Sequence, residues 1–316
     1  MSGKSQHINT GVRIFTIGET TYDILFRDGQ PVGACSGGSA YNSAISLGRC
    51  GLPVSLISTF GNDHIGDLSL AFLLKNGVNC NLIKRFEGQS RIALAFFDSG
   101  NNADYSFYKA SKDMVPDYPV PQKNDIILLG SSFALRDNGR DNLIAYLTQA
   151  QKVGGIIIYD PNARQSMVDK PGLLDKILQN IALATITKGS DQDFQNIFGL
   201  NDAKQVYSQI SELGTKYLVY TKGAEGAELF APDIHLAIKA NETKVVSTIG
   251  AGDNFSAGIV YGLFNHLINN QHFEDFTPSE WEEIMKSGTL FASEVCGSSE
   301  NYLPEVTSKR LFFRSA

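Results

Sequence analysis

The chain has 316 residues, of which 42% are hydrophobic and 19% are charged, and its formal net charge is −6. This composition excludes a disordered chain, and the 27 scattered Lys and Arg residues exclude the basic surface that nucleic-acid binding requires. No apolar run approaches 18 residues and no apolar leader is present, so we expect a cytoplasmic protein without membrane contact.

Strands and helices alternate along most of the chain, and each strand is short and apolar on both faces. In chain order, the patterns predict strand 12–18, helix 39–50, strand 53–61, helix 66–76, strand 125–130, helix 138–152, strands 155–160 and 182–187, helices 191–198 and 202–213, strand 217–221, and helices 254–269 and 279–295. Strands of this kind are typical of a parallel sheet that helices cover on both faces. The sequence therefore predicts an α/β fold: a doubly wound, mainly parallel sheet in one domain over residues 1–316.

Two segments interrupt this alternation and have no crossover helix of their own. Residues 22–37 and 90–110 each have the pattern of a β-hairpin, with turns at Asp28-Gly29 and at 99–102. We expect these strands, inserted at about 21–36 and 88–111, to form a small four-stranded sheet that projects from the main domain as a lid. Aromatic residues alternate along the second hairpin, and an apolar outer face on the lid would be buried if two lids paired in a homodimer.

The stretch Gly-Ala-Gly-Asp at 250–253 precedes an apolar helical pattern. The small side chains of Gly250, Ala251 and Gly252 leave their backbone N–H groups open to a ligand at the N-terminus of that helix, which makes a ready anion site. Asp253 follows, and a carboxylate at a helix N-terminus is favoured in its ionised form. Two interpretations remain open at this point: a general base beside an anion cradle, or the N-cap of a buried helix.

The stretch 35–51, CSGGSAYNSAISLGRCG, is a second turn of small residues followed by a helix. Asn42 in that helix carries both a donor and an acceptor, which suits a sugar hydroxyl. Asp23, which follows the first strand, has two acceptor oxygens for adjacent hydroxyls. Each residue also has a purely structural interpretation, Asn42 as a satisfied polar group on a helix and Asp23 as a turn residue.

Together these stretches resemble the ribokinase-like, phosphofructokinase-B type carbohydrate kinases. The stretch 37–67 is similar to the first signature of that family, and STIGAGDNFSAGIVYGLF at 247–264 is similar to the second. Two long signatures about 200 residues apart in the right order are far more specific than one glycine-rich turn. The resemblance covers nearly the whole chain and implies a ribokinase-like fold with ATP-dependent phosphorylation of a sugar hydroxyl.

The resemblance also implies the catalytic residues. In it, Asp253 is the general base that deprotonates the acceptor hydroxyl. The anion hole for the transferred phosphoryl group is formed by the amides of Gly250, Ala251, Gly252 and Asp253.

The resemblance places Asp23, Gly38 and Asn42 on the sugar. Tyr108 from the aromatic residues of the lid, and the cations Lys109 and Arg164, are further candidates for substrate binding, with a surface or sheet-edge ion pair as the structural interpretation of Arg164. Ribokinases usually have Lys after the paired glycines, where this chain has Ser39, and the stretches 105–113, 131–137 and 160–164 are more similar to fructokinases and 2-keto-3-deoxygluconate kinases. Relatives that bind the acidic sugar usually have Arg where Lys109 stands, and Lys lacks the fork that binds a carboxylate through two hydrogen bonds. The sequence therefore favours a neutral ketohexose such as fructose, with 2-keto-3-deoxygluconate or ribose as alternatives.

The nucleotide-binding residues come from two stretches. TKGAEG at 221–226 is similar to the family's strand-end turn over the nucleotide, which makes Thr221 and Gly223 candidates for contacts with ATP. TKGSDQDF at 187–194 adds Lys188 and Ser190. Where relatives usually have a Glu that organises Mg²⁺ and the phosphates, this chain has Asp193, whose shorter side chain would reach the ion through water.

Two functions of different class follow from these observations. One is an ATP-dependent sugar kinase with a sugar, ATP and Mg²⁺ as ligands, and the other is a non-catalytic sugar- or nucleotide-binding protein on the same fold. Departures from the family pattern at Ser190, Asp193 and Ser247 support the second. Ser247 stands where relatives often have an Asp that helps to hold a monovalent cation. The intact 250–253 turn supports the first, and we expect the kinase.

Overall fold

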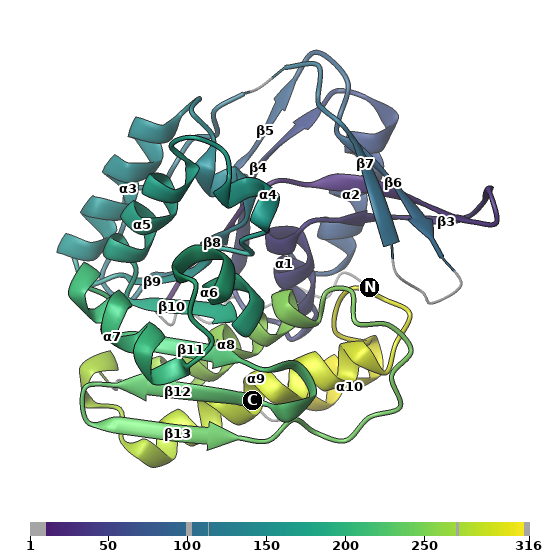
Figure 1. The fold of residues 1–316 in the computed structure, drawn as a ribbon. Coiled ribbons are helices and arrows are strands. Elements are labelled where there is room, and N and C mark those ends of the chain that lie inside the picture. Colours follow the sequence, from purple (N-terminus) through teal and green to yellow (C-terminus); the bar gives the residue numbers. More distant parts are fainter. Residues whose placement is uncertain (1–10, 99–102, 113, 270–271, 313–316) are drawn as a thin grey trace, which may run out of the picture.

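The computed structural model describes residues 11–98, 103–112, 114–269 and 272–312. Its main body is a nine-stranded sheet in the order β13-β12-β11-β10-β9-β8-β1-β4-β5, drawn in Figure 1. The strands are β1 Ile14–Ile17, β4 Val54–Gly61, β5 Ile83–Phe86, β8 Ile126–Gly130, β9 Ile156–Asp160, β10 Ile186–Ser190, β11 Tyr217–Thr221, β12 Ala227–Ala231 and β13 Ile234–Ile238. All pairs from β5 to β11 are parallel, and β12 and β13 continue the sheet as antiparallel strands.

Helices cover both faces of this sheet, which confirms the predicted doubly wound α/β fold. The hydrophobic cluster on one face includes residues of α1 Ser39–Arg49, α2 His64–Lys75, α8 Ala251–Leu267, α9 Pro278–Cys296 and α10 Glu305–Phe312. The cluster on the other face includes residues of α3 Arg140–Lys152, α5 Leu173–Leu183, α6 Asp191–Phe198 and α7 Ala203–Leu213. Short helical turns complete the chain: α4 Gln165–Val168, η1 Ser132–Leu135, η2 Gly223–Glu225 and η3 Phe273–Asp275. Successive residues of β1 alternate between the two clusters, with Ile14 in the first and Phe15 in the second, because side chains of a strand point to opposite faces.

A small second sheet has the order β3-β2-β6-β7 and projects to one side of the main body in Figure 1. Its strands are β2 Thr21–Arg27, β3 Gln30–Gly37, β6 Ile92–Phe97 and β7 Ala103–Tyr108. The two hairpins, β2–β3 and β6–β7, are antiparallel, and β2 and β6 join them in parallel. The first hairpin turns at Asp28 and Gly29 with φ of 50° and 73°, the left-handed values that a two-residue hairpin turn needs. The predicted turn at 99–102 lies outside the described residues.

Some element boundaries predicted from the sequence are wrong. The strand placed at 182–187 begins inside α5, which ends at Leu183, and β10 starts only at Ile186. The sequence analysis did not predict α5, α10, β5 or the β12–β13 hairpin. The helix expected from residue 254 begins at Ala251, with Gly250 as its N-cap, so Asp253 lies in the first turn and the N-cap interpretation of Asp253 is wrong.

The strand order places a crevice at the carboxyl ends of the central strands. From β1 the chain proceeds to β4 and β5 on one side of the sheet, and later to β8 and its successors on the other. Open α/β sheets bind ligands at such a reversal, outside the carboxyl ends of the strands. In the part of the chain that the structure describes, no helix combines the length and apolarity that a bilayer crossing needs.

Candidate active site

A cleft of about 2050 Å³ lies at this crevice, where the main sheet, the small sheet and the N-terminus of α8 meet. Every residue that the sequence analysis placed in a site lines this one cleft. These residues are Asp23, Gly38, Asn42, Tyr108, Lys109, Arg164, Lys188, Ser190, Asp193, Thr221, Gly223, Gly250, Ala251, Gly252 and Asp253. Residues far apart in the sequence are thus brought together, while their individual roles remain predictions.

The turn before α8 is shaped by glycine. Gly250 has φ 79°, and a Cβ added there would lie 2.5 Å from the backbone oxygen of Asn301, so only glycine fits without a shift of the backbone. The first turn of a helix leaves its N–H groups without helical partners. Among the described residues, none accepts a hydrogen bond from the N–H of Gly252 or Asp253. These two amides are therefore available to an anion in the cleft.

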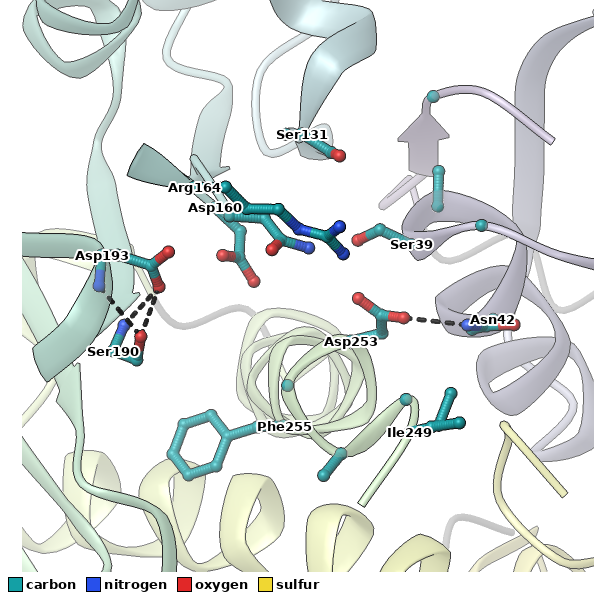
Figure 2. Close-up of a pocket in the computed structure, with 18 of the residues that line it drawn as sticks. Ser39, Asn42, Ser131, Asp160, Arg164, Ser190, Asp193, Ile249, Asp253 and Phe255 are labelled. Atoms are coloured by element: carbon teal, nitrogen blue, oxygen red, sulfur yellow. Dashed lines mark hydrogen bonds between the residues drawn. The ribbon is translucent and has the colours of Figure 1, made fainter. Parts of the chain in front are cut away.

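Three side chains of α1 hold the start of α8 in place. Asn42 Nδ2 donates to Asp253 Oδ2 at 2.8 Å, as Figure 2 shows, and Ser43 Oγ donates to the Asp253 backbone oxygen at 2.9 Å. Ser46 Oγ donates to Asn254 Oδ1. The second carboxylate oxygen of Asp253, Oδ1, accepts no hydrogen bond within the described chain. A carboxylate with one anchored and one open oxygen is oriented for a proton transfer.

The part of the cleft with the predicted sugar residues Asp23, Gly38 and Asn42 presents hydrogen-bond acceptors. Asn42 is buried, and its Oδ1 has no partner among the described residues. Asp23 is also buried, and its Oδ1 accepts from Thr21 Oγ1 at 2.7 Å. Burial raises the pKa of Asp23, and the hydrogen bond from Thr21 opposes that shift. Gly38, with φ 114°, lies against the backbone of Glu19, where an added Cβ would be 2.4 Å from the carbonyl oxygen.

The rim of the cleft carries the other three predicted substrate residues. Tyr108 and Lys109 are exposed at the end of β7. Arg164 is exposed before α4, and its side chain extends into the cavity toward Ser39 in Figure 2. The backbone oxygen of Arg164 accepts from the N–H groups of Met167 and Val168, but in the described part of the chain its side chain makes no hydrogen bond or ion pair, so its guanidinium is available to an anionic group.

Among the predicted nucleotide residues, Gly223 opens onto the cleft. It has φ 53°, and no atom lies within 4 Å of the position of an added Cβ. Thr221 Oγ1 donates to the Gly189 backbone oxygen at 3.3 Å. Thr221 ends β11 and Gly223 follows it in the β11–β12 connection, where the open space at Gly223 leaves room for a ligand at this end of the cleft.

Ser190 and Asp193 form a capping box at the start of α6. Asp193 Oδ2 accepts from the N–H and Oγ of Ser190, both at 2.7 Å, and Oδ1 accepts from the N–H of Ala163 at 2.7 Å. Burial nevertheless raises the pKa of Asp193, with a contribution from the nearby Asp160 carboxylate. Both carboxylate oxygens are therefore engaged in holding α6, which does not fit direct metal ligation by Asp193.

The site also contains residues that the sequence analysis missed. Asp160, the last residue of β9, is buried in an ion pair with Lys188, so that the ammonium of Lys188 is not free in this structure. Ser131 and Asn162 follow β8 and β9 with φ of 54° and 44°, backbone conformations that non-glycine residues adopt rarely. Such outliers gather at functional sites, and both residues line the cleft. A signal was present for Asp160, a carboxylate at a strand end one strand away from a lysine, but none was present for the other two.

A cleft at the carboxyl ends of a doubly wound sheet, an anion-binding helix N-terminus and an oriented carboxylate beside it define a phosphotransferase that acts on a hydroxyl group. Comparison with known proteins gives the family. Residues 13–307 match the model of the pfkB family carbohydrate kinases, and the chain belongs to that family. It is therefore a carbohydrate kinase, which favours the kinase interpretation over a non-catalytic binding protein.

Several curated relatives are named fructokinase. The chain is 30% identical over 260 residues to the fructokinase of Rhizobium leguminosarum bv. trifolii, covering 79% of each chain. It is 26% identical over 259 residues to the fructokinase of Escherichia coli, covering 79% of this chain and 84% of that one.

Solved structures give the same fold. A fructokinase from Vibrio cholerae O395 in its fructose, ADP and calcium ion bound form has a TM-score of 0.83 at 20% identity, covering 96% of this chain and 100% of that one. Aminoimidazole riboside kinase from Salmonella enterica has a TM-score of 0.81 at 21% identity, covering 95% and 99%. The fold is thus that of the ribokinase-like sugar kinases, as the sequence predicted.

Proposed function

We propose that this kinase transfers the γ-phosphoryl group of ATP to a hydroxyl of a ketohexose, fructose first, with Asp253 as the general base. One observation carries the proposal. Asn42 anchors one oxygen of the Asp253 carboxylate at 2.8 Å and leaves the other open to the cleft, beside the free amides of Gly252 and Asp253. A base and an anion site thus lie within one helix turn.

The reaction follows from this arrangement. Asp253 Oδ1 accepts the proton of the sugar hydroxyl as that oxygen forms a bond to the γ-phosphorus. The bond from the γ-phosphorus to the bridging oxygen breaks, and ADP leaves with the electron pair. The amides of Gly252 and Asp253 hold the negative charge that develops on the transferring group, in an orientation set before the reaction starts.

ATP fits the nucleotide side of the cleft, because Gly223, Gly250 and Gly252 expose backbone there and Thr221 lies beside them. The described residues contain no group of three His, Cys, Asp or Glu side chains that could coordinate Mg²⁺. We therefore propose that Mg²⁺ is held by the nucleotide phosphates and water, as this ion commonly is. Asp193 would contact it only through that water.

The acceptors on the sugar side support a neutral polyol. Asn42 Oδ1 and Asp23 Oδ2 accept no hydrogen bond in the described part of the chain, and sugar hydroxyls supply the donors that they lack. The fructokinase relatives support fructose among such sugars. The guanidinium of Arg164 favours 2-keto-3-deoxygluconate as the second candidate, because a sugar carboxylate would pair with it. Ribose is the third, since Ser39 replaces the lysine that ribokinases usually carry.

We propose that the small sheet closes over the bound sugar, because water in an open site would compete as the acceptor. Exposed apolar side chains of the small sheet, Val32 and Phe96, support pairing of two such sheets in a homodimer. Sedimentation velocity measures this directly, and a monomer at all concentrations would contradict the pairing.

We expect no potassium activation. Ser247 Oγ accepts from the N–H of Ile249 at 3.2 Å, and the position offers no carboxylate to a monovalent cation. Turnover in potassium chloride should equal turnover in tetramethylammonium chloride at the same ionic strength. A clear increase with potassium would show that backbone oxygens suffice to hold the cation.

The proposal is tested by ADP release, coupled to NADH oxidation, with fructose, 2-keto-3-deoxygluconate, ribose, nucleosides and fructose 6-phosphate as acceptors. We expect the highest kcat/KM with fructose. The highest value with 2-keto-3-deoxygluconate would move the substrate to the acidic sugar and Arg164 to its carboxylate. No release with any acceptor would overturn the proposed function.

A further inference from the structure

A buried ion pair lies next to the 250–253 turn at the start of α8. Lys188 Nζ is 2.7 Å from Asp160 Oδ2, and the two side chains are 5% and 7% exposed. The pairing follows from strand register, because β9 and β10 are parallel neighbours with Thr187 opposite Tyr159, so that the next residues of both strands also lie side by side. Figure 2 shows Asp160 and Asp253 among the residues that line the same cavity.

Two donors of this cluster reach the first turn of α8. Lys188 Nζ donates to the Gly252 carbonyl oxygen at 3.3 Å, and Ser256 Oγ donates to the same oxygen at 3.3 Å and to Asp160 Oδ2 at 2.9 Å. The Gly252 carbonyl thus lies against the ammonium of Lys188. An added Cβ at Gly252 would be 3.3 Å from Nζ, so the ammonium packs closely against this residue.

The Gly252 carbonyl and the Asp253 N–H belong to one peptide unit. That unit is planar and trans, so the N–H points away from the carbonyl, and fixing one fixes the other. Gly252 and Asp253 lie in the first turn of α8, and contacts to the Gly252 carbonyl oxygen add to the helical backbone in fixing this peptide unit. Lys188 and Ser256 supply those contacts, and Lys188 itself lines the cleft.

Stability alone does not account for such a pair. Removing two charges from water is costly, and apolar residues of similar volume often replace a buried ion pair without loss of stability. The pair carries no net charge, so its effect on the start of α8 comes from the hydrogen bond that Lys188 donates to the Gly252 carbonyl oxygen.

We infer that Lys188 is a positioning residue for phosphoryl transfer: through the Gly252 carbonyl it holds the Asp253 N–H toward the cleft, while Asp160 holds Lys188 and Ser256 holds Asp160. The inference rests on the proposed function, in which that N–H stabilises the transferring group. It differs from direct contact between Lys188 and the nucleotide, which the family resemblance implies. Direct contact would affect the binding of ATP, whereas positioning affects turnover.

The test compares Lys188→Met with the double variant Asp160→Asn/Lys188→Met, which leaves no stranded carboxylate if the single variant folds poorly. Kinetics are measured with ATP and the sugar that the wild type phosphorylates best. We expect kcat to fall by about 10² in both variants while both KM values change little, the pattern of an interaction made in the transition state. Added n-propylammonium should restore part of the kcat of Lys188→Ala but none of Asp253→Asn.

Arg13→Met is the matched control. Arg13 pairs with Asp125, whose side chain is 0% exposed, at the amino edge of the same sheet, away from the cleft. It should lower the melting temperature and leave kcat unchanged. A wild-type kcat in the Lys188 variants, or a loss confined to the KM for ATP, would overturn the inference while leaving the proposed function standing. An inactive wild type would instead contradict the proposed function.

Discussion

Asp253→Asn separates the general base from a carboxylate that only stabilises a helix. Asp253 lies in the first turn of α8 and caps no backbone N–H with its side chain. Loss of its charge there removes a dipole interaction of about 0.3–1 kcal/mol. Its hydrogen bond from Asn42 becomes a neutral one, which costs about 1 kcal/mol more, while the shape of the side chain is kept. The melting temperature should therefore fall by only a few degrees.

Turnover should respond far more strongly. Loss of a general base lowers kcat by about 10²–10⁴, which is about 2.7–5.4 kcal/mol in the barrier. Both quantities are measured on the same preparation, by ADP release with fructose and by thermal unfolding. The structure thus predicts a large change in kcat with a small change in stability.

Asp202→Asn is the matched control, because Asp202 also lies at a helix N-terminus. Its side chain accepts from the N–H of Gln205 at 2.9 Å, on the exposed start of α7 and outside the cleft. This variant should keep wild-type turnover. If Asp253→Asn also turned over at nearly the wild-type rate, Asp253 would be a helix-end carboxylate and the assigned role would be wrong.

Four further substitutions test the rest of the site. Asn42→Ala should raise the KM for sugar more than the KM for ATP, because the buried side-chain carbonyl oxygen of Asn42 has no partner in the described chain. Steady-state kinetics measures both KM values, and an equal increase in the two would contradict this role. Gly250→Ala should lower stability by about 1–3 kcal/mol in urea unfolding, since φ is 79° and its Cβ would lie 2.5 Å from the Asn301 oxygen. In Gly252→Ala the added Cβ has no backbone atom of another segment within 4 Å, so this variant should lose less stability than Gly250→Ala. A larger loss of stability in Gly252→Ala would refute the reasoning. Burial raises the pKa of Asp23, so the folded state favours its protonated form, and stability is lost as pH rises from the ordinary Asp range through the raised value. Asp23→Asn should therefore be more stable than the wild type at pH 7 in urea unfolding, and the difference in stability should shrink toward acid pH. A difference that grows toward acid pH would contradict the raised pKa of Asp23.

The order of strands and helices could be read from the sequence because each element carries its own pattern. Apolar runs such as 125–130 and 155–160 are strands of the buried sheet, and the hairpin at Asp28-Gly29 follows from local turn chemistry. Boundaries failed where one apolar run continues through two elements. Residues 181–187 include the end of α5 and the start of β10, and periodicity does not separate them.

Glycine misled the prediction at α8. The sequence suggested a helix from residue 254, because glycine disfavours helices in isolation. In the structure the helix already includes Ala251, Gly252 and Asp253, and Gly250 is its N-cap. Ser43 of α1 donates to the Asp253 backbone oxygen and so holds this first turn, and tertiary contacts of this kind outweigh propensity.

The sequence by itself determined the fold class, the family and the residue types of the site, since these depend on local patterns and on two signatures. Only the tertiary structure decided which side chains act on one another. Asn42 and Asp253 are 211 residues apart, and Asp160 and Lys188 are 28 apart on neighbouring strands. Such contacts depend on strand register and helix packing, which no local pattern specifies. The 250–253 turn could be identified from the sequence. Only the tertiary structure, which brings the strands and α8 together, shows that Lys188 and Ser256 contact this turn.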